Sequence, residues 1–285
     1  MLSRVICLII ISSCLFGCSK NDSAPTQSND STKTGQIDSS AWKIDGYTLI
    51  WQDEFNGPAV EASKWVCEIG NNNGWGNNEL EYYTNRPENV KIDNGNLIIT
   101  AKKESYSGKD YTSARLKTQG KFSCRYGKIE SRIKLPYGQG IWPAFWMLGT
   151  SISNVGWPKC GEIDIMEMTG GSGARDRTVY GTAHWDNNGH QSYGKNYSTP
   201  SGKFADGYHK FAITWDAKKI VWSFDDVEYC TLDITSAALN AFQENYFILL
   251  NLAVGGNWPG NPDSATVFPQ TMSVDYVRVY RKNIQ

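Results

Sequence analysis

The chain has 285 residues and a nearly balanced charge, with 28 Lys and Arg against 29 Asp and Glu and a formal net charge of −1. This balance removes any electrostatic argument for nucleic acid as a partner, and the length suits one large domain or two small ones. Aromatic residues make up 13% of the chain and include 11 Trp, more than a core usually needs. The composition favours an open groove whose indole faces suit the apolar faces of a neutral polysaccharide.

The first 17 residues have the pattern of an export signal. Arg4 provides the positive start, and Val5 to Ile11 form an apolar run that is too short to anchor the chain across a bilayer. The ending Leu15-Phe16-Gly17-Cys18 resembles the lipobox of bacterial lipoproteins, in which cleavage precedes a cysteine that is then acylated. We therefore predict a lipoprotein signal peptide over residues 1–17 and lipidation of Cys18. The alternative is an ordinary secretory signal that is cleaved elsewhere.

This pattern implies an exported protein that is anchored by lipid in a membrane, at the outer membrane or the cell surface. Residues 18–41 are rich in Ser, Asn, Thr, Asp and Lys, and Ile37 is their only branched aliphatic residue. Such a segment cannot bury enough apolar surface to fold, so we predict a flexible polar linker. The region from 42 to 285 is then a single domain.

Four cysteines lie in this domain, at Cys67, Cys124, Cys160 and Cys230. Export permits disulfides, and four cysteines allow three pairings, among which the sequence does not choose. Free thiols are equally compatible with it. The spacings lack the close pairs that are typical of a zinc site.

The hydrophobic pattern of the domain is that of β-strands. Alternating apolar residues predict strands over Lys128–Leu135, Lys210–Trp215 and Ile220–Phe224, the last two joined by a hairpin turn at Asp216–Lys219. The nearly continuous apolar run Tyr246–Val254 predicts a strand buried in the core of a sandwich.

The ends of the domain and its one helical segment complete this pattern. Only Ile234–Phe242 looks helical, and a final strand is expected over Val274–Tyr280. Leu49–Trp51 and Val277–Tyr280 both have the pattern of edge strands, and we expect them to pair. Many short strands with Gly, Asn and Pro turns over about 240 residues predict an all-β fold with one β-sandwich.

The acidic stretch Glu162-Ile163-Asp164-Ile165-Met166-Glu167 is the most informative part of the chain. Strict alternation puts Glu162 and Asp164 on one face of a strand and Glu167 on the other. One extra residue in a β-bulge after Asp164 brings all three onto the same face. Their carboxyl groups can then approach to about 5–5.5 Å, the separation of a retaining glycoside hydrolase. The alternative is a solvent-facing acidic strand, against which the aromatic-rich flanks argue.

Together with its flanking motifs, this stretch resembles the signature of glycoside hydrolase family 16, in its bulged E-x-D-x-x-E form. The ordered set of motifs is similar to that of the laminarinase branch, the endo-1,3-β-glucanases. The other segments that carry the resemblance span almost the whole domain and are Trp51–Phe55, Asn77–Thr84, Gly140–Leu148, Gly181–Trp185, Asn251–Gly256 and Val274–Tyr280.

The resemblance implies a concanavalin A-like jelly roll with an open substrate cleft on its concave sheet. It also implies that Glu162 is the nucleophile and Glu167 the general acid/base. The chemistry requires an ionised Glu162 to attack the anomeric carbon and a protonated Glu167 to donate to the leaving oxygen. Because two carboxyls this close do not both ionise easily, one pKa must rise. Asp164 lies between them and is expected to hydrogen-bond the nucleophile.

Further residues are candidates for substrate binding. Trp142 and Trp146 share a strand face and can stack on sugars, with core packing as an equal alternative, and the resemblance places His184 near the acid/base. Trp258 lies in a Gly/Pro loop where burial is hard, which favours a sugar platform. Three more candidates for contacts with sugar hydroxyls are Asn78, Glu79 and Arg115.

The family resemblance further implies a structural calcium ion on the face away from the cleft. Glu54, Gly95 and Asp275 are the candidate sources of oxygen ligands, and the cation would stabilise the fold and take no part in catalysis. We expect no cofactor in the reaction itself. The chain is expected to act as a monomer.

The predicted activity is retaining endo-hydrolysis of β-1,3 bonds, or of mixed β-1,3-1,4 bonds, in laminarin-like polysaccharides. The alternatives are a galactan hydrolase of the same fold, acting on agar or carrageenan, and a surface lipoprotein that binds glucan without cutting it. A transglycosylase would use the same intermediate and differ only in its acceptor.

Overall fold

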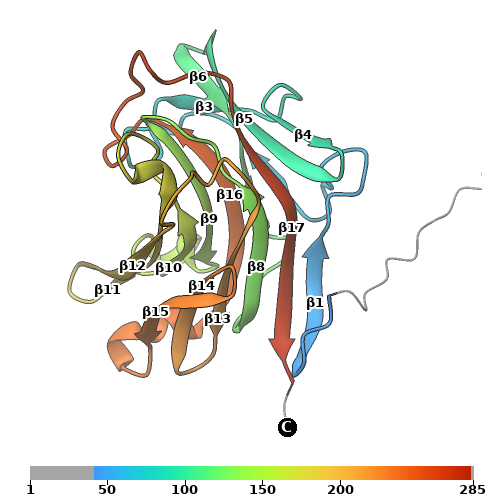
Figure 1. Ribbon diagram of the computed structural model, residues 1–285. Coiled ribbons are helices and arrows are strands. Elements are labelled where there is room, and N and C mark those ends of the chain that lie inside the picture. The colour runs from blue at the N-terminus through green and yellow to red at the C-terminus, as the bar shows by residue number, and fades with distance from the viewer. Residues whose placement is uncertain (1–41, 284–285) are drawn as a thin grey trace, which may run out of the picture. The chain divides into compact units, whose positions relative to one another are not determined.

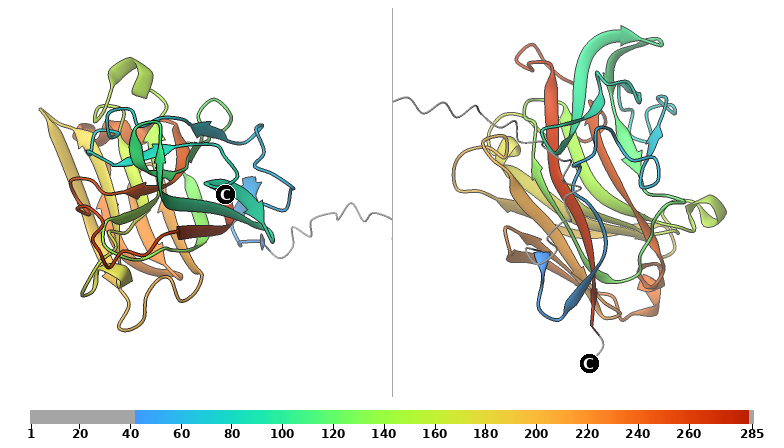
Figure 2. Two further views of the ribbon diagram at one scale, coloured as in Figure 1. Left: turned by 90° about the horizontal axis from the view of Figure 1, so that it is seen from above. Right: turned by 90° about the vertical axis from the view of Figure 1, so that its right-hand side faces the viewer.

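The computed structural model of the protein describes residues 42–283. The predicted signal peptide, the lipidation of Cys18 and the polar linker lie outside these residues. Within them almost every element is a β-strand, and the strands form two sheets (Figures 1 and 2). The prediction of an all-β jelly-roll sandwich is confirmed.

The larger sheet has ten strands. Off its main path, β1 (Tyr47–Asp53) pairs with β17 and β4 (Val90–Asp93) pairs with β5. The main path runs in the order β15 (Val227–Asp233), β14 (Lys219–Phe224), β13 (His209–Trp215), β8 (Gly127–Lys134), β17 (Gln270–Lys282), β5 (Asn96–Tyr106), β6 (Lys109–Ser113) and β3 (Glu81–Tyr83).

The smaller sheet has seven strands and carries the cleft. Three short helical segments lie outside the sheets: α1 (Ile152–Val155), η2 (Arg175–Arg177) and η3 (Ala237–Gln243). The strand order is β12 (His190–Ser198), β11 (Thr178–Asp186), β10 (Glu162–Glu167), β9 (Ile141–Gly149), β16 (Tyr246–Val254), β7 (Arg115–Lys117) and β2 (Val66–Glu68).

Two predictions about the ends of the domain need correction. Leu49 does pair with Tyr280, as expected, but β17 is not an edge strand, since it also pairs with β8 and β5. The helical pattern over Ile234–Phe242 becomes the 3₁₀ segment η3, which is interrupted at Leu239, and α1 and η2 are additional. A segment this short is stabilised by burial of a few side chains, here Leu239 and Phe242, and does not need a regular α-helix.

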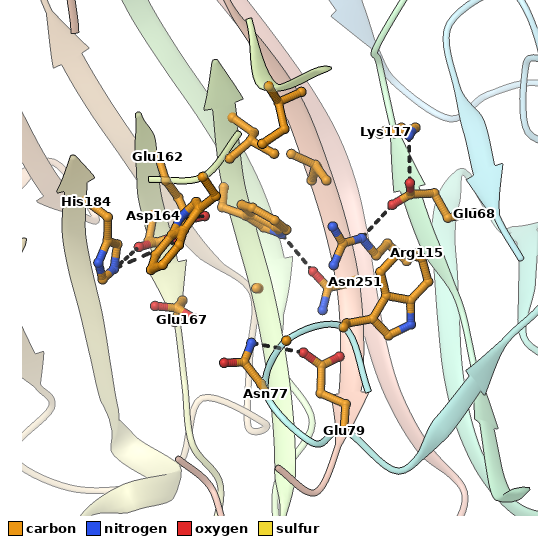
Figure 3. A pocket seen from close by; sticks show the side chains of 18 of the residues that line it. Glu68, Asn77, Glu79, Arg115, Lys117, Glu162, Asp164, Glu167, His184 and Asn251 are labelled. Carbon is orange, nitrogen blue, oxygen red and sulfur yellow. Dashed lines mark hydrogen bonds and ion pairs between the residues drawn. The ribbon is translucent and has the colours of Figure 1, made fainter. Parts of the chain in front are cut away.

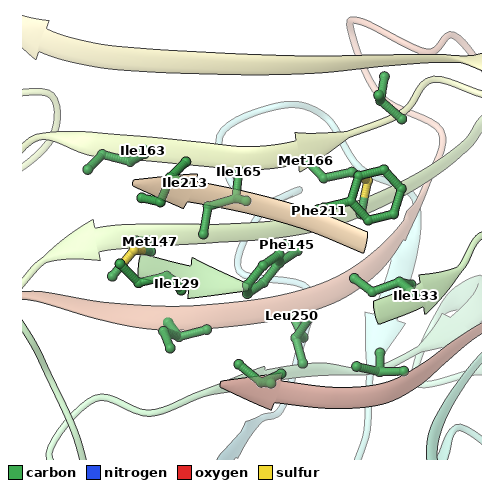
Figure 4. Packing of buried hydrophobic residues seen from close by; sticks show 14 of the residues in the cluster. Ile129, Ile133, Phe145, Met147, Ile163, Ile165, Met166, Phe211, Ile213 and Leu250 are labelled. Atoms are coloured by element: carbon green, nitrogen blue, oxygen red, sulfur yellow. The ribbon is translucent and has the colours of Figure 1, made fainter. Parts of the chain in front are cut away.

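The core lies between the two sheets, where apolar side chains from both meet (Figure 4). Ile163, Ile165 and Met166 of β10 face inward, and the opposite sheet contributes Ile213 and Ile129. All five side chains are at most 1% exposed. Burying them fixes which face of β10 turns outward, because alternate residues of a strand point to opposite sides.

Strand β16 shows that a continuous apolar run does not always mean burial between two sheets. All nine of its residues are buried, as predicted, and Ile248 and Leu250 do belong to the core. The alternate residues Phe247, Leu249 and Asn251 instead line the cleft. The run is apolar on both faces because its outer face is the floor of the cleft.

The four cysteines of the described region are all free thiols. Burial raises the pKa of Cys124 to about 12 and that of Cys160 to about 11, the latter with a contribution from the charge of Glu162. The open question of disulfide pairing is thus answered for these residues: the fold does not bring them together. No helix within residues 42–283 has the length and apolarity needed to cross a membrane.

Candidate active site

The predicted bulge is present in β10. Glu162 pairs with His184 of β11 and Asp164 with Thr182, but the register then shifts so that Glu167 pairs with Tyr180. A shift also occurs against β9 on the other side, between Asp164 and Met166. The bulge turns Glu162, Asp164 and Glu167 toward the same cleft, which all three line (Figure 3).

A tryptophan from the other sheet supports this strand. The indole Nε1 of Trp222, in β14, donates a 2.7 Å hydrogen bond to the backbone carbonyl of Asp164. Gly181 of β11 leaves the room for it, since a Cβ there would lie 2.4 Å from the Trp222 ring. Because a bulge disrupts the regular ladder, this bond stabilises the backbone that carries the acidic residues.

Two of the acidic side chains accept hydrogen bonds from tryptophans, and the third lies beside a histidine. Glu162 Oε2 accepts a hydrogen bond from Trp157 Nε1 at 3.1 Å, and Glu167 Oε1 accepts one from Trp142 Nε1 at 3.0 Å. Asp164 Oδ2 lies 3.2 Å from Nε2 of His184. The expected hydrogen bond between Asp164 and Glu162 is not among the contacts of the described residues, and His184 approaches both carboxyls instead.

The pKa values of all three acids are raised. Burial and the charge of Asp164 raise the pKa of Glu162 to about 8, against the opposing effect of His184 and Arg115. Burial raises the pKa of Asp164 to about 8. The pKa of Glu167 is raised well above its usual value by burial and by both neighbouring acids. The cluster therefore retains protons at neutral pH, and Glu167 is suited to the role of proton donor.

Two histidines extend the site toward its rim. Nδ1 of His184 lies 2.8 Å from Nε2 of His190, the first residue of β12. The His190 ring also packs against Trp157, with the ring centroids 4.6 Å apart. Sequence reasoning missed both Trp157 and His190. Trp157 had a detectable signal, because it is an aromatic residue in a loop five positions before Glu162.

The cleft has a volume of about 790 Å³ and continues away from the acids across β9, β16 and β7. Trp146 Nε1 donates to Asn251 Oδ1 at 2.7 Å, and the Arg115 guanidinium lies over the Trp146 ring, 4.9 Å from its centroid. Arg115 also lies over Trp75 and donates to Glu68 at 2.6 Å. This end offers aromatic faces and polar groups side by side, as carbohydrate sites do.

Most of the predicted binding residues line the cleft, and their roles stay predictions. Arg115, Trp142, Trp146, His184 and Trp258 all do so. The side chain of Trp258 is 43% exposed and packs edge-on against Trp142. Trp75 was missed, although it lies in a Gly/Asn loop and the argument used for Trp258 applies to it equally.

The Asn/Gly loop differs from expectation in detail. Asn78 is not among the lining residues; it donates to Asn257, while its neighbour Asn77 faces the cleft. Glu79 lines the cleft but is 6% exposed, because it packs beside the fully buried Glu81 and accepts from Tyr83. The backbone of Asn78 is left-handed, with φ 57°, which turns its side chain out of the cleft.

The candidate calcium ligands are engaged with arginines. Both carboxylate oxygens of Glu54 accept hydrogen bonds from Arg278, and Asp275 pairs with Arg132 at 2.7 Å. Among the described residues, both oxygens of Glu54 and one oxygen of Asp275 are therefore paired with arginines, whereas Asp275 Oδ1 and the backbone oxygen of Gly95 are not. The calcium site stays a prediction.

The family model for Glycosyl hydrolases family 16 matches residues 77–278. The chain belongs to this family. It is 39% identical to the Beta-glucanase of Rhodothermus marinus, over 84% of the chain and 87% of that relative. The structure of an endo-1,3-beta-glucanase (laminarinase) catalytic domain from Thermotoga petrophila shares 46% identity with it at a TM-score of 0.77, covering 85% of the chain and 100% of that domain.

Other relatives are much longer than this family 16 chain. It spans 34% and 38% of the length of two curated relatives, one of them the Glucan endo-1,3-beta-glucosidase A1 of Niallia circulans. With the latter it shares 39% identity over 84% of its own length. The similarity thus concerns the domain that carries the cleft.

Proposed function

We propose that this family 16 chain is a retaining endo-β-1,3-glucanase that cuts laminarin-like chains within the cleft. The observation that carries the proposal is the bulged strand β10, which presents Glu162 and Glu167 to one cleft, where the pKa values of both are raised. The names of the relatives support β-1,3-glucan as the substrate, and mixed β-1,3-1,4-glucan is the second substrate to test.

In the proposed reaction the Glu162 carboxylate attacks the anomeric carbon while Glu167 gives its proton to the leaving oxygen. The glycosyl-enzyme is then hydrolysed by water, which Glu167, now ionised, deprotonates. Trp142 keeps Glu167 oriented through its 3.0 Å hydrogen bond. Trp157 holds the other oxygen of Glu162 and leaves Oε1 free for the attack.

The test is product analysis of the purified protein on laminarin, mixed-linkage glucan and agarose, beside Glu162→Gln. A ladder of oligosaccharides from laminarin that the variant does not produce supports the proposal, and NMR of the first products should show the β-anomer. Glu228→Gln, an exposed position on β15 in the other sheet, is the matched control and should keep wild-type activity.

Other outcomes would overturn parts of the proposal. Cleavage of agarose in place of laminarin would keep the mechanism and replace the substrate. Longer oligosaccharides than the starting ones would identify a transglycosylase. Laminarin binding without cleavage of any glycan would make the chain a capture protein.

We also propose that the protein is exported and anchored through acylated Cys18. The support is the sequence Leu15-Phe16-Gly17-Cys18 after a short apolar run. Mass spectrometry of the mature N-terminus tests this, because acylation adds the mass of the lipid to Cys18. The proposed acylation would be contradicted if the wild type and Cys18→Ser were both cleaved at the same site and neither carried lipid at its mature N-terminus. A surface position suits a polymer too large for ready uptake.

A further inference from the structure

Three atoms without hydrogen-bond partners converge beside the nucleophile. Oε2 of Glu162 is hydrogen-bonded to Trp157, and its Oε1 has no hydrogen-bond partner among the described residues. Nδ1 of His184 is hydrogen-bonded to His190, and its Nε2 has no hydrogen-bond partner in the described part of the chain. Asp164 is 2% exposed, and its Oδ2 has no hydrogen-bond partner. A buried carboxylate oxygen without a hydrogen-bond donor from the protein is unfavourable, because the loss of its hydration is not compensated by such a bond.

The distances among these atoms suit a metal ion. Nε2 of His184 lies 3.2 Å from Asp164 Oδ2 and 3.9 Å from Glu162 Oε1. Among residues 42–283 this is the one group of three His, Cys, Asp or Glu side chains that offers ligand atoms within 4.8 Å of one another. Two ligands of a tetrahedral Zn²⁺ stand ~3.3 Å apart, given metal–ligand bonds of ~2.0–2.1 Å. The distance between His184 and Asp164 already has about this value, whereas the Glu162 oxygen would have to move closer to bind the same ion.

The surroundings also suit a transition metal. Zinc-binding histidines are usually held by a hydrogen bond at the other ring nitrogen, which here is the 2.8 Å contact between His184 and His190. An imidazole nitrogen and carboxylate oxygens are ligand types that zinc accepts, and a site with three protein ligands keeps a fourth position for water or another ligand. The side chains of Glu162 and His184 are 17% and 19% exposed, so the fourth position faces the cleft.

We propose that Glu162, Asp164 and His184 form a binding site for Zn²⁺ or a similar transition metal, and that the bound ion inhibits the enzyme. The ion would occupy the free oxygen of the nucleophile and the space next to it, so metal and substrate would exclude each other. Metal binding does not depend on the reaction, whereas the inhibition rests on the proposed glucanase activity.

Isothermal titration of the purified protein with Zn²⁺ tests binding directly, and the visible spectrum of Co²⁺ reports the coordination geometry. We expect one Zn²⁺ per chain and a tetrahedral Co²⁺ spectrum. His184→Asn and Asp164→Asn should each weaken Zn²⁺ binding by at least about tenfold. Circular dichroism and laminarin pull-down show whether these variants are folded.

The matched control is His209→Asn. His209 is the remaining histidine of the described region; it pairs with Asp225 at 2.8 Å in the other sheet and does not line the cleft. This variant should bind Zn²⁺ as the wild type does.

In laminarin hydrolysis by the wild type, Zn²⁺ should raise the apparent KM without changing kcat. Removal of the Zn²⁺ with a chelator should restore the rate.

Several results would overturn the proposal. Binding that His209→Asn weakens as much as His184→Asn would assign the ion to the protein surface. Loss of binding in His190→Ala but not in Asp164→Asn would place the metal between the two imidazoles. If Zn²⁺ binds but does not affect the hydrolysis of laminarin, the ion does not bind at the nucleophile Glu162. If the protein binds Zn²⁺ but does not hydrolyse laminarin even without the metal, only the proposed glucanase function is contradicted.

Discussion

Two glutamates of the same cleft, Glu162 and Glu68, are equally buried and titrate in opposite directions. Their side chains are 17% and 16% exposed. Burial raises the pKa of both, but at Glu68 this effect is outweighed by Arg115 and Lys117, each at 2.6 Å, and its pKa is lowered. Glu162 has Asp164 as its neighbour, and its pKa rises to about 8.

The comparison shows that partners, and not burial alone, divide this cleft into two regions. At one end acids stand beside acids, so their pKa values are raised and the cluster retains protons, which suits proton donation by Glu167, whereas nucleophilic attack requires the ionised form of Glu162. At the other end the Glu68 carboxylate pairs with two cations, of which Arg115 also lies over the rings of Trp75 and Trp146. Under the proposed function, the first end carries out the chemistry and the second end holds the ligand.

The largest expected effect concerns Glu167. Glu167→Ala removes the proton donor, and kcat on laminarin should fall by about 10²–10⁴-fold. The wild-type rate should decline as pH rises through the raised pKa of Glu167, because the ionised form cannot donate, and the variant should lack this alkaline limb. Measuring the rate of laminarin hydrolysis across pH for the wild type and the variant checks the loss of kcat and the loss of the alkaline limb. Azide added to the variant should replace water as a nucleophile that needs no base in the second step. Glu68→Gln is the control and should retain the alkaline limb.

The second prediction compares the stability of Glu162→Gln and Glu68→Gln. A raised folded-state pKa favours folding below the unfolded pKa, and this contribution is lost as pH rises through about 8. Glu162→Gln should therefore be more stable than the wild type at pH 8 to 9, by on the order of a few kcal/mol. The difference should vanish in acid, and urea unfolding at several pH values measures it.

Glu68→Gln should behave in the opposite way. The lowered pKa of Glu68 contributes stability above its unfolded value, and this contribution is lost as pH falls. At pH 7 the variant should lose about 1–3 kcal/mol of unfolding free energy, because Arg115 and Lys117 lose a charged hydrogen-bond partner. If both variants changed the free energy of unfolding by the same amount and in the same direction, the proposed division of the cleft into two electrostatically different regions would be refuted.

A third prediction concerns the support of the bulge. Trp222→Phe keeps the aromatic packing but leaves the Asp164 carbonyl without its 2.7 Å donor, at a cost of about 1–3 kcal/mol in stability. We expect kcat to fall while KM for laminarin is nearly unchanged, because the acids move and the binding end does not. Trp215→Phe, whose indole donates to Phe242 away from the cleft, is the matched control. A wild-type kcat in Trp222→Phe would show that the bulge needs no such support.

The smallest expected effect is that of His190→Ala. This variant removes one hydrogen bond to His184, worth about 0.5–1.5 kcal/mol, so kcat/KM should fall by about tenfold or less. Because the charge of His184 lowers the pKa of Glu162, the acid limb of the pH profile should shift as well. His190→Gln retains a polar partner and should restore most of the rate. If the pH profile of His190→Ala were the same as that of the wild type, the contact between His184 and His190 would have a structural role only.

The sequence by itself determined the all-β fold, the bulge and the three acids on one face. Alternation sets the face of each strand residue, a bulge adds Glu167 to the face of Glu162 and Asp164, and the aromatic-rich flanks favoured a cleft over a solvent-facing acidic strand. Alternation also predicted that Trp142 and Trp146 share a strand face, and the family resemblance placed His184 near Glu167; all three line the cleft. The pairing of Leu49 with Tyr280 was also predicted, although not the central position of β17.

Only the tertiary structure decided which side chains meet across the cleft. The contacts of Trp157 with Glu162, of His190 with His184 and of Trp222 with the Asp164 carbonyl join residues 5, 6 and 58 positions apart. The lowered pKa of Glu68 depends on such contacts as well, because its charged partners Arg115 and Lys117 lie 47 and 49 positions away in the sequence.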